Sequence, residues 1–421
     1  MVSSSRRRLL RGTLATLALA WGVSAHLPAT DLVLLRPDRV IDGRGGVLEG
    51  ATVVVRGQSI ERVVPPDSEV AAGPAPADAR VLELSGATLL PGLIDTHVHL
   101  DWYFDRNDRL RTEQSGDPVE VQVLHAVENA WRMLQAGVTT VQSLGSPLDR
   151  PVRDALKRGV LPGPRILTSL DAITAQTGGP DAIRAWVRRL HADGADVIKI
   201  FASASIRDGG SPTLSQEQLD AACGEARRLG LRATVHAHGP ESARRAANAG
   251  CTTIEHGALL DRETLELLAE NGVFYDPNID LIFRNYFENE RRYLGIGNYT
   301  AEGFAQMRQA QPRALATFRT ALAVPGLQIV FGTDAVAGAH GRNVEELVYR
   351  IVEGGQQPHA AILSATSIAA SSLGLDDRIG AIAAGLEADL LAVEGNPLED
   401  ASALLRPVMV MRAGMLVRSG L

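Results

Sequence analysis

The sequence predicts an α/β protein in which a (β/α)8 TIM-like barrel carries a small β-sandwich domain built from both chain ends. Three observations support this prediction. The middle of the chain repeats a glycine followed by a short apolar strand, with helical stretches between the repeats. Both ends instead contain short β-branched runs interrupted by Gly, Pro and Asp. Potential metal ligands stand at the ends of the predicted strands, where barrels place their sites.

The first 25 residues are predicted to be a targeting segment. An arginine-rich start precedes a short apolar run, and the small residues before Ala25 match a cleavage site. Ser5-Arg6-Arg7 resembles the twin-arginine export signal. The expected location is therefore the periplasm or the exterior, without a stable membrane anchor, because the apolar run is short for a bilayer. The alternative is an uncleaved anchor.

The two ends of the chain are expected to meet in one domain. Residues 26–90 and 384–421 contain runs such as "ATVVVRG" and "EADLLAVEG", which are typical of strands. Residues 91–383 are assigned to the barrel. The ends can share a domain only if the barrel returns the chain to its starting point.

The middle of the chain alternates helix and strand. The helix expected before Gly137 has one apolar stripe, formed by Val121, Leu124, Val127, Trp131 and Leu134. The strand "VTTVQSL" follows it, and the glycine-strand unit then recurs at Gly194, Gly230, Gly250, Gly272 and Gly326. Adding "TLLPGLIDTHVH" as the first strand and "PRILTSL" as the third gives eight units. Ser215 and Gln218 form a predicted capping box.

Six side chains that can bind metals stand at the carboxyl ends of these strands. They are His97, His99, Lys199, His236, His256 and Asp334. A single histidine would be read as a packed core residue, but six such groups on one face indicate a metal site. Imidazoles and a carboxylate suit zinc best, with manganese, cobalt or iron as alternatives. Six ligands exceed one open tetrahedral site, so we expect two divalent ions.

Lys199 is one of only two lysines among 42 basic residues, and it lies inside an apolar strand. Burial lowers the pKa of a lysine, and the neutral amine can react with CO2 to form a carbamate that bridges two cations. Arginine stays protonated and cannot do this. The alternative is a lysine paired with a buried carboxylate.

The motifs "PGLIDTHVHL", "VIKIF", "TVHAHG", "TIEHG" and "FGTDA" together resemble the amidohydrolase superfamily. The likeness is closer to its imidazolonepropionase-like branch, which includes Xaa-Pro dipeptidases. The resemblance covers roughly residues 31–421. It implies that His97, His99 and Asp334 hold one ion, that His236 and His256 hold the other, and that carbamylated Lys199 bridges them.

One position departs from this family pattern. Pro180 in "QTGGPD" stands where relatives often carry a histidine. The departure removes an expected substrate-orienting donor.

The predicted activity is hydrolysis of an amide bond in a dipeptide or an N-acyl amino acid by a metal-bridging hydroxide. Asp334 would accept the proton of the water and pass it to the leaving amine. The same site also suits a lactone, a cyclic amide or a phosphotriester. The complete ligand set argues against a non-catalytic binding protein.

Substrate contacts are expected from residues near the strand ends. His238 is predicted to contact the substrate or to assist catalysis, and His340 and Asn343 (or Arg342) to bind substrate from a loop. Arg207 is expected either to pair with a substrate carboxylate or to be a surface arginine.

The remaining expectations concern partners and cysteines. The net charge of −7 gives no support for nucleic-acid binding, so the expected partner is a small molecule, and a homo-oligomer is compatible with the composition. Cys223 and Cys251 are the only cysteines. Two unpaired buried thiols are favoured slightly over a bridge.

Overall fold

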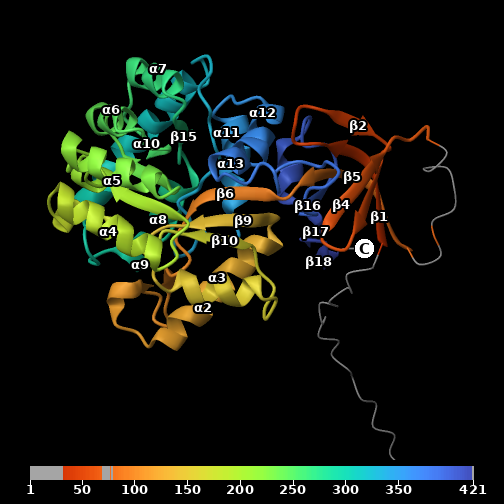
Figure 1. Ribbon diagram of the computed structural model, residues 1–421, viewed down its shortest axis with the longest axis horizontal. Helices are drawn as coiled ribbons and strands as arrows, with labels where there is room; N and C mark the ends of the chain where they lie inside the picture. The colour runs from red at the N-terminus through yellow and green to blue at the C-terminus, as the bar shows by residue number, and fades with distance from the viewer. Residues whose placement is uncertain (1–31, 69–75, 77–78, 420–421) are drawn as a thin grey trace, which may run out of the picture.

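The computed structural model describes residues 32–68, 76 and 79–419. The predicted targeting segment therefore lies outside the described residues. Two parts are visible in Figure 1: parallel strands surrounded by helices, and a sheet that contains strands from both ends of the chain. Within the described part of the chain, no helix is both long enough and apolar enough to cross a membrane.

The strands from both chain ends form one eight-stranded sheet, in the order β18-β17-β16-β5-β1-β3-β4, with β2 paired to β1. The bounds are β1 (Leu32–Ile41), β2 (Val47–Glu49), β3 (Thr52–Arg56), β4 (Ser59–Val64), β5 (Ala79–Pro91), β16 (Leu390–Glu394), β17 (Pro407–Arg412) and β18 (Met415–Ser419). The antiparallel pairing of β5 with β16 joins the two ends. The expected sandwich is thus built as one continuous hydrogen-bonded sheet.

Alternation along β16 gives this sheet two different apolar faces. Leu390 and Ala392 belong to a core formed within the sheet. Leu391 and Val393 belong to a second cluster, which also includes Val98 and residues of helices from the middle of the chain. Because neighbouring side chains of a strand point to opposite faces, the sheet holds its own core and also packs against the rest of the protein.

The middle of the chain contains two parallel sheets. The first has the order β10-β9-β6 and the second runs from β11 to β15. The bounds are β6 (Leu93–Val98), β9 (Val138–Ser143), β10 (Arg165–Thr168), β11 (Ala172–Ile173), β12 (Val197–Phe201), β13 (Arg232–Ala237), β14 (Thr253–His256) and β15 (Phe274–Asp276). A short hairpin pairs β7 (Tyr103–Phe104) with β8 (Leu110–Arg111).

The two parallel sheets do not merge into one closed sheet within the described residues. The third predicted strand, residues 164–170, is observed as β10, and the chain then turns at Leu170, whose φ is 62°, before the short β11 joins the other sheet. The eighth predicted strand forms only isolated parallel bridges, Tyr275 with Ile329 and Val98 with Ala335. These bridges still place residues 329–335 between β15 and β6.

Helices connect and cover the parallel strands. They are α2 (Val119–Gln135), α3 (Asp149–Lys157), α4 (Pro180–Ala192), α5 (Gln216–Arg228), α6 (Pro240–Asn248), α7 (Arg262–Glu270), α8 (Leu281–Glu288), α9 (Glu290–Tyr293), α10 (Ala301–Ala321), α11 (Asn343–Val352), α12 (Pro358–Ser364) and α13 (Ser367–Ser372). Short 3-10 turns cover Glu113–Ser115, Ala175–Thr177, Ile206–Asp208 and Ala401–Leu405. The predicted capping box of Ser215 and Gln218 starts α5.

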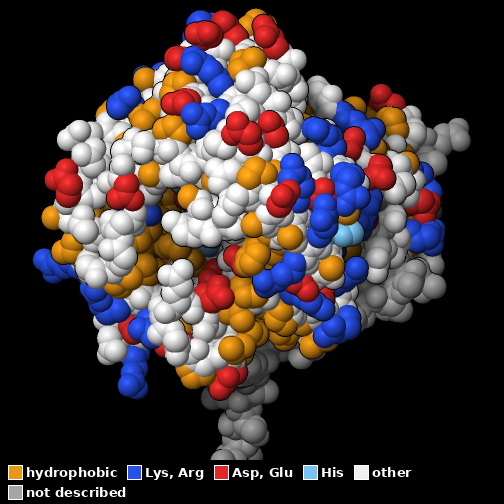
Figure 2. Space-filling view, turned by 60° about the vertical axis from the view of Figure 1, so that its left-hand side comes forward, with side chains coloured by type: hydrophobic (Ala, Val, Ile, Leu, Met, Phe, Trp, Pro, Cys, Tyr) orange, Lys and Arg blue, Asp and Glu red, His pale blue; other side chains and the backbone are white. Residues whose placement is uncertain are grey.

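The buried face of α2 differs from the predicted stripe. Ala126, Ala130 and Met133 are fully buried, whereas Leu124 is 69% exposed. Leu134 of the predicted stripe is also fully buried, so the stripe is confirmed at its end, while Val121 and Leu124 are left at the surface. On the face shown in Figure 2, basic and acidic side chains are interspersed.

Cys223 and Cys251 form a disulfide, with an S–S distance of 1.99 Å. The expectation of two unpaired thiols was therefore wrong. Cys223 lies on α5 and Cys251 lies just before β14, and both are buried. Adjacent βα units bring the two residues together, although they are 28 positions apart in the chain.

Replacing both cysteines by serine is expected to lower the free energy of unfolding by about 3 kcal/mol, because the open chain gains loop entropy on unfolding. Denaturant unfolding of the double variant under oxidising conditions measures this effect. Wild-type protein unfolded with and without a reductant is the control. Equal unfolding free energies for the variant and the oxidised wild type would contradict the bridge.

Candidate metal centre

All six predicted ligands line one cavity, together with His238. His97 lies in β6, Lys199 in β12 and His236 in β13, and His256 ends β14. His99 follows β6 directly. Asp334 is held beside β6, since its backbone N–H donates to the His97 carbonyl at 2.8 Å. The carboxyl ends of parallel strands meet at one edge, which explains why residues so far apart in sequence converge.

The first group of donors is His97, His99 and Asp334, whose ligand atoms lie within 4.8 Å of one another. Asp334 Oδ1 is 3.1 Å from His99 Nε2 and 3.4 Å from His97 Nε2. Burial alone would raise the pKa of Asp334, but the neighbouring His97 and His99 lower it below its ordinary value. Burial lowers the pKa of His97 well below its usual range. This group therefore presents an anionic carboxylate and a neutral imidazole.

Lys199 lies next to this group and is fully buried. Its Nζ is 3.3 Å from His97 Nε2. Burial lowers the pKa of Lys199, against the opposing effect of Glu255 and Asp334. The charge of Lys199 also contributes to lowering the pKa values of His236 and His256. The amine therefore contacts the first group and lines the same cavity as the second.

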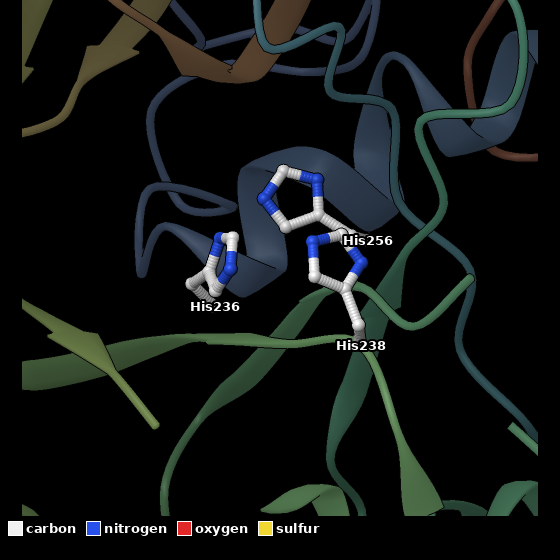
Figure 3. Close-up of side chains that lie close together, drawn as sticks. All are labelled: His236, His238 and His256. Atoms are coloured by element: carbon white, nitrogen blue, oxygen red, sulfur yellow. The ribbon is translucent and has the colours of Figure 1, made fainter. Parts of the chain in front are cut away.

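The second group of donors is His236, His238 and His256. The three rings point toward one another in Figure 3, with centroid separations of 4.6, 4.6 and 4.9 Å. Burial lowers the pKa values of His236 and His256 well below the usual range, and burial and Arg207 lower that of His238 to about 3. Neutral imidazoles are the form that binds cations. The sequence assigned His238 to the substrate, and the structure adds it to the donor set.

His256 and Asp334 share an unusual backbone conformation. Their φ values are 67° and 53°, in the left-handed region that residues with a side chain rarely adopt. Such a residue costs about 1–3 kcal/mol and persists only where its surroundings hold it. His256 adopts this conformation at the end of β14 and lines the cavity, whereas Glu255 contacts His97 from outside the cavity lining. The site therefore contains strain that the fold offsets elsewhere.

The far wall of the cavity is mainly aromatic and carries one cation. Tyr286 and Tyr299 line it, and the Arg207 guanidinium lies 5.6 and 4.1 Å from their ring centres. Arg207 Nε donates to Asn298 Oδ1 at 2.9 Å. Arg207 is thus a cavity residue and not a surface arginine. Residues 278–300 supply much of this wall, and Trp102 from residues 101–117 stands 5.7 Å from the His99 ring.

Two predicted substrate residues do not reach the cavity lining. His340 Nε2 contacts the His99 carbonyl oxygen at 2.9 Å. Asn343 is fully buried and donates to Asp95 Oδ2 at 2.7 Å. Arg342 pairs with Glu288 and Glu345. In this structure the polar atoms of His340 and Asn343 contact residues around the site, and their role toward a substrate stays a prediction.

Pro180 is the first residue of α4, after the N-cap Gly179. Proline suits this position because the first helical N–H lacks an intrahelical acceptor. Pro180 does not line the cavity.

The donors in this cavity fit divalent cations. Among the residues that the structure describes, the buried His238 Nδ1 has no hydrogen-bond partner, and burial keeps the pKa values of His236 and His256 well below their usual range. One carboxylate and several imidazoles form a set typical of zinc and related metals.

The fold is α/β and its donor set is a candidate metal centre, and comparison with known proteins gives the family. The sequence profile of the amidohydrolase family matches residues 88–417, so the chain belongs to that family. It is therefore a hydrolase that acts on carbon–nitrogen bonds.

The chain is similar to a solved Xaa-Pro dipeptidase with bound methionine in its active site. The two are 31% identical, the match covers 92% of this chain and all of that one, and the TM-score is 0.81. A prolidase complexed with N-methylphosphonate-L-proline is 25% identical, with a TM-score of 0.80 and coverage of 92% and 100%. The ochratoxinase of Aspergillus niger is 28% identical over 367 residues, which is 76% of this chain and 73% of that protein. These likenesses confirm the superfamily branch that the motifs indicated.

Proposed function

We propose that this protein is an exported dinuclear amidohydrolase that cleaves the amide bond of a small substrate carrying a free carboxylate, such as a dipeptide or an N-acyl amino acid. The observation that carries the proposal is the pair of donor groups in one cavity, with the buried Lys199 amine next to them. The architecture that goes with it is a (β/α)8 barrel, in which residues 329–335 take the place of the eighth strand.

His97, His99 and Asp334 would hold one divalent ion, and His236 and His256 the other, with His238 as a further donor. Zinc is the metal best matched to these groups. Such ions would activate a water molecule and polarise the scissile carbonyl. The neutral Lys199 amine would take up CO2, forming an N–C bond and releasing one proton, and the resulting carbamate oxygens would contact both ions.

Asp334 is the residue placed to move the proton. Its carboxylate is ionised and faces His97 and His99 inside the cavity. It would accept a proton from the attacking water at Oδ1 or Oδ2 and deliver it to the nitrogen of the leaving amine. The surrounding apolar wall, which includes Ile282 and Phe283, would exclude other water.

Arg207 is the residue proposed to bind the substrate carboxylate. It is the cation of the far wall, and its stacking on Tyr299 and its contact with Asn298 fix the guanidinium in the cavity. The names of the similar proteins support this substrate class: a dipeptidase, a prolidase and an ochratoxinase. The aromatic wall favours an apolar group next to the amide.

Export to the periplasm or exterior is proposed from the basic and apolar start of the sequence. The Cys223–Cys251 disulfide supports it, because stable disulfides are rare in reducing compartments. The mature protein would act on its small substrate without a nucleic-acid partner, as a single chain or as a homo-oligomer.

Counting the metal ions per chain tests the site, and a panel of dipeptides, N-acyl amino acids, lactones, cyclic amides and phosphotriesters tests the bond. Two ions and fastest turnover of amides would support the proposal. One ion with turnover of a cyclic amide would replace it by a mononuclear, imidazolonepropionase-like activity. No bound metal after reconstitution with zinc and bicarbonate would refute it.

Replacing Arg207 by methionine is expected to raise KM for substrates with a free carboxylate by about tenfold or more, because a charge-assisted hydrogen bond to a charged group is lost. Substrates whose carboxylate is capped as an amide should change little. The comparison of kcat and KM for each matched pair measures this. Equal losses for the two forms would contradict a role in carboxylate binding.

A further inference from the structure

Two carboxylates lie behind the His97 ring. Its Nε2 faces the cavity residues Asp334 and Lys199, whereas its Nδ1 lies 2.7 Å from Glu255 Oε2. Glu255 is fully buried, and neither it nor its neighbour Asp276 lines the cavity. The two ring nitrogens of His97 therefore face different surroundings.

Glu255 and His97 depend on each other. Within the described residues, His97 Nδ1 has no other hydrogen-bond partner, whereas the Glu255 carboxylate also interacts with the Asp276 side chain. The other carboxylate oxygen of Glu255 accepts a hydrogen bond from the Thr234 hydroxyl. Glu255 pairs in register with Asp276 on β15, and Thr96 Oγ1 donates to Asp276 Oδ2 at 3.1 Å. The strands on both sides of β14 thus contribute to the surroundings of Glu255.

We propose that Glu255 is the positioning residue of His97. Its carboxylate accepts a hydrogen bond from the Nδ1–H of His97, and this tautomer leaves the Nε2 lone pair directed into the cavity. The inference rests on the proposed function and deepens it. A histidine that binds a metal usually donates its other ring N–H to a carboxylate or carbonyl, and this contact fixes the tautomer and the ring orientation. Glu255 acts through His97 and not on the substrate.

A competing interpretation is that Glu255, Asp276 and His97 bind a cation themselves, since their ligand atoms lie within 4.8 Å of one another. The 2.7 Å contact favours a shared proton, because it is a normal hydrogen-bond length. An additional ion bound at this group, lost on replacement of Glu255, would overturn the proposal.

The test is the Glu255→Gln variant of the full chain, loaded with zinc and measured by chelator competition and by metal count. We expect the affinity for the zinc ion that His97 holds to fall about 10- to 100-fold. At saturating zinc the same number of ions should bind. Loading with cobalt(II) should also give an altered visible absorption spectrum, since the ligand geometry at His97 changes.

Asp149→Asn is the matched control. Asp149 is also a fully buried carboxylate, held by Thr168, but it belongs to neither donor group. Its zinc affinity and cobalt spectrum should match the wild type. Equal losses of affinity in both variants would mean that a buried carboxylate matters only for folding, and would overturn the positioning role.

An unchanged affinity and spectrum in a folded Glu255→Gln protein would also overturn it. If that variant does not fold, the same measurements are made on Glu255→Asp. The shorter side chain keeps the negative charge but moves the carboxylate away from His97 Nδ1. Wild-type affinity in Glu255→Asp would contradict the proposal. If the wild type binds no metal at all, the proposed function fails, and that result is distinct from any change between variants.

Discussion

Replacing Lys199 by arginine is expected to abolish two-metal binding and to reduce kcat/KM by about a thousandfold or more, as loss of a group essential to the metal centre does. The Lys199 amine is fully buried, and burial lowers its pKa, so it can be neutral enough to react with CO2. A guanidinium stays charged and cannot form the carbamate. Metal count and steady-state kinetics on the same preparation measure both effects.

A larger charged side chain can also disturb this buried position, so a second variant is needed. Lys199→Ala removes the amine and leaves space beside His97. If a carbamate occupies that space in the wild type, added acetate or propionate should restore part of the second metal and part of the activity. A Lys199→Arg or Lys199→Ala protein that binds two metals without added carboxylate would refute the bridge.

Asp334→Asn is expected to lower kcat by about a thousandfold, within the range for loss of a general base. Asparagine tolerates the left-handed conformation at φ 53°, so the fold should survive. Because the pKa of Asp334 lies below its ordinary value of 3.8, the carboxylate is ionised above that pH. The wild-type kcat/KM should therefore show no fall caused by Asp334 until the pH drops below this value.

Asp101→Asn is the control for Asp334. Asp101 is a buried carboxylate two residues beyond His99, and it does not line the cavity. Its kcat should stay within a few-fold of the wild type. Metal counts on both variants separate loss of the base from loss of an ion. Full activity in Asp334→Asn would require another group to move the proton.

The chemistry of the site could be predicted from the sequence because ligand residues and strand ends coincide. Period-two alternation places His97 and His99 on one side of their strand, and a glycine before each of several later strands sets a common depth. All six predicted donors line the cavity in the structure. Lys199 was informative because a lysine in an apolar strand needs a reason to be there.

Other parts of the site could not be predicted from local patterns. Alternation assigns Glu255 and His256 to opposite faces, yet His256 lines the cavity and Glu255 contacts the His97 ring from outside it. Residues 278–300 contribute the aromatic wall only through their packing over the strand ends. His340 was predicted to bind substrate near the site, but its Nε2 contacts the His99 carbonyl oxygen in the structure.

The sequence by itself determined the order of βα units, the donor set and the family, because these depend on residue type and spacing along the chain. The tertiary structure alone decided which atoms meet. It paired Cys223 with Cys251, left Leu124 of α2 at the surface and placed Glu255 behind His97. These outcomes depend on contacts between elements distant in sequence, where packing and backbone strain outweigh local preference.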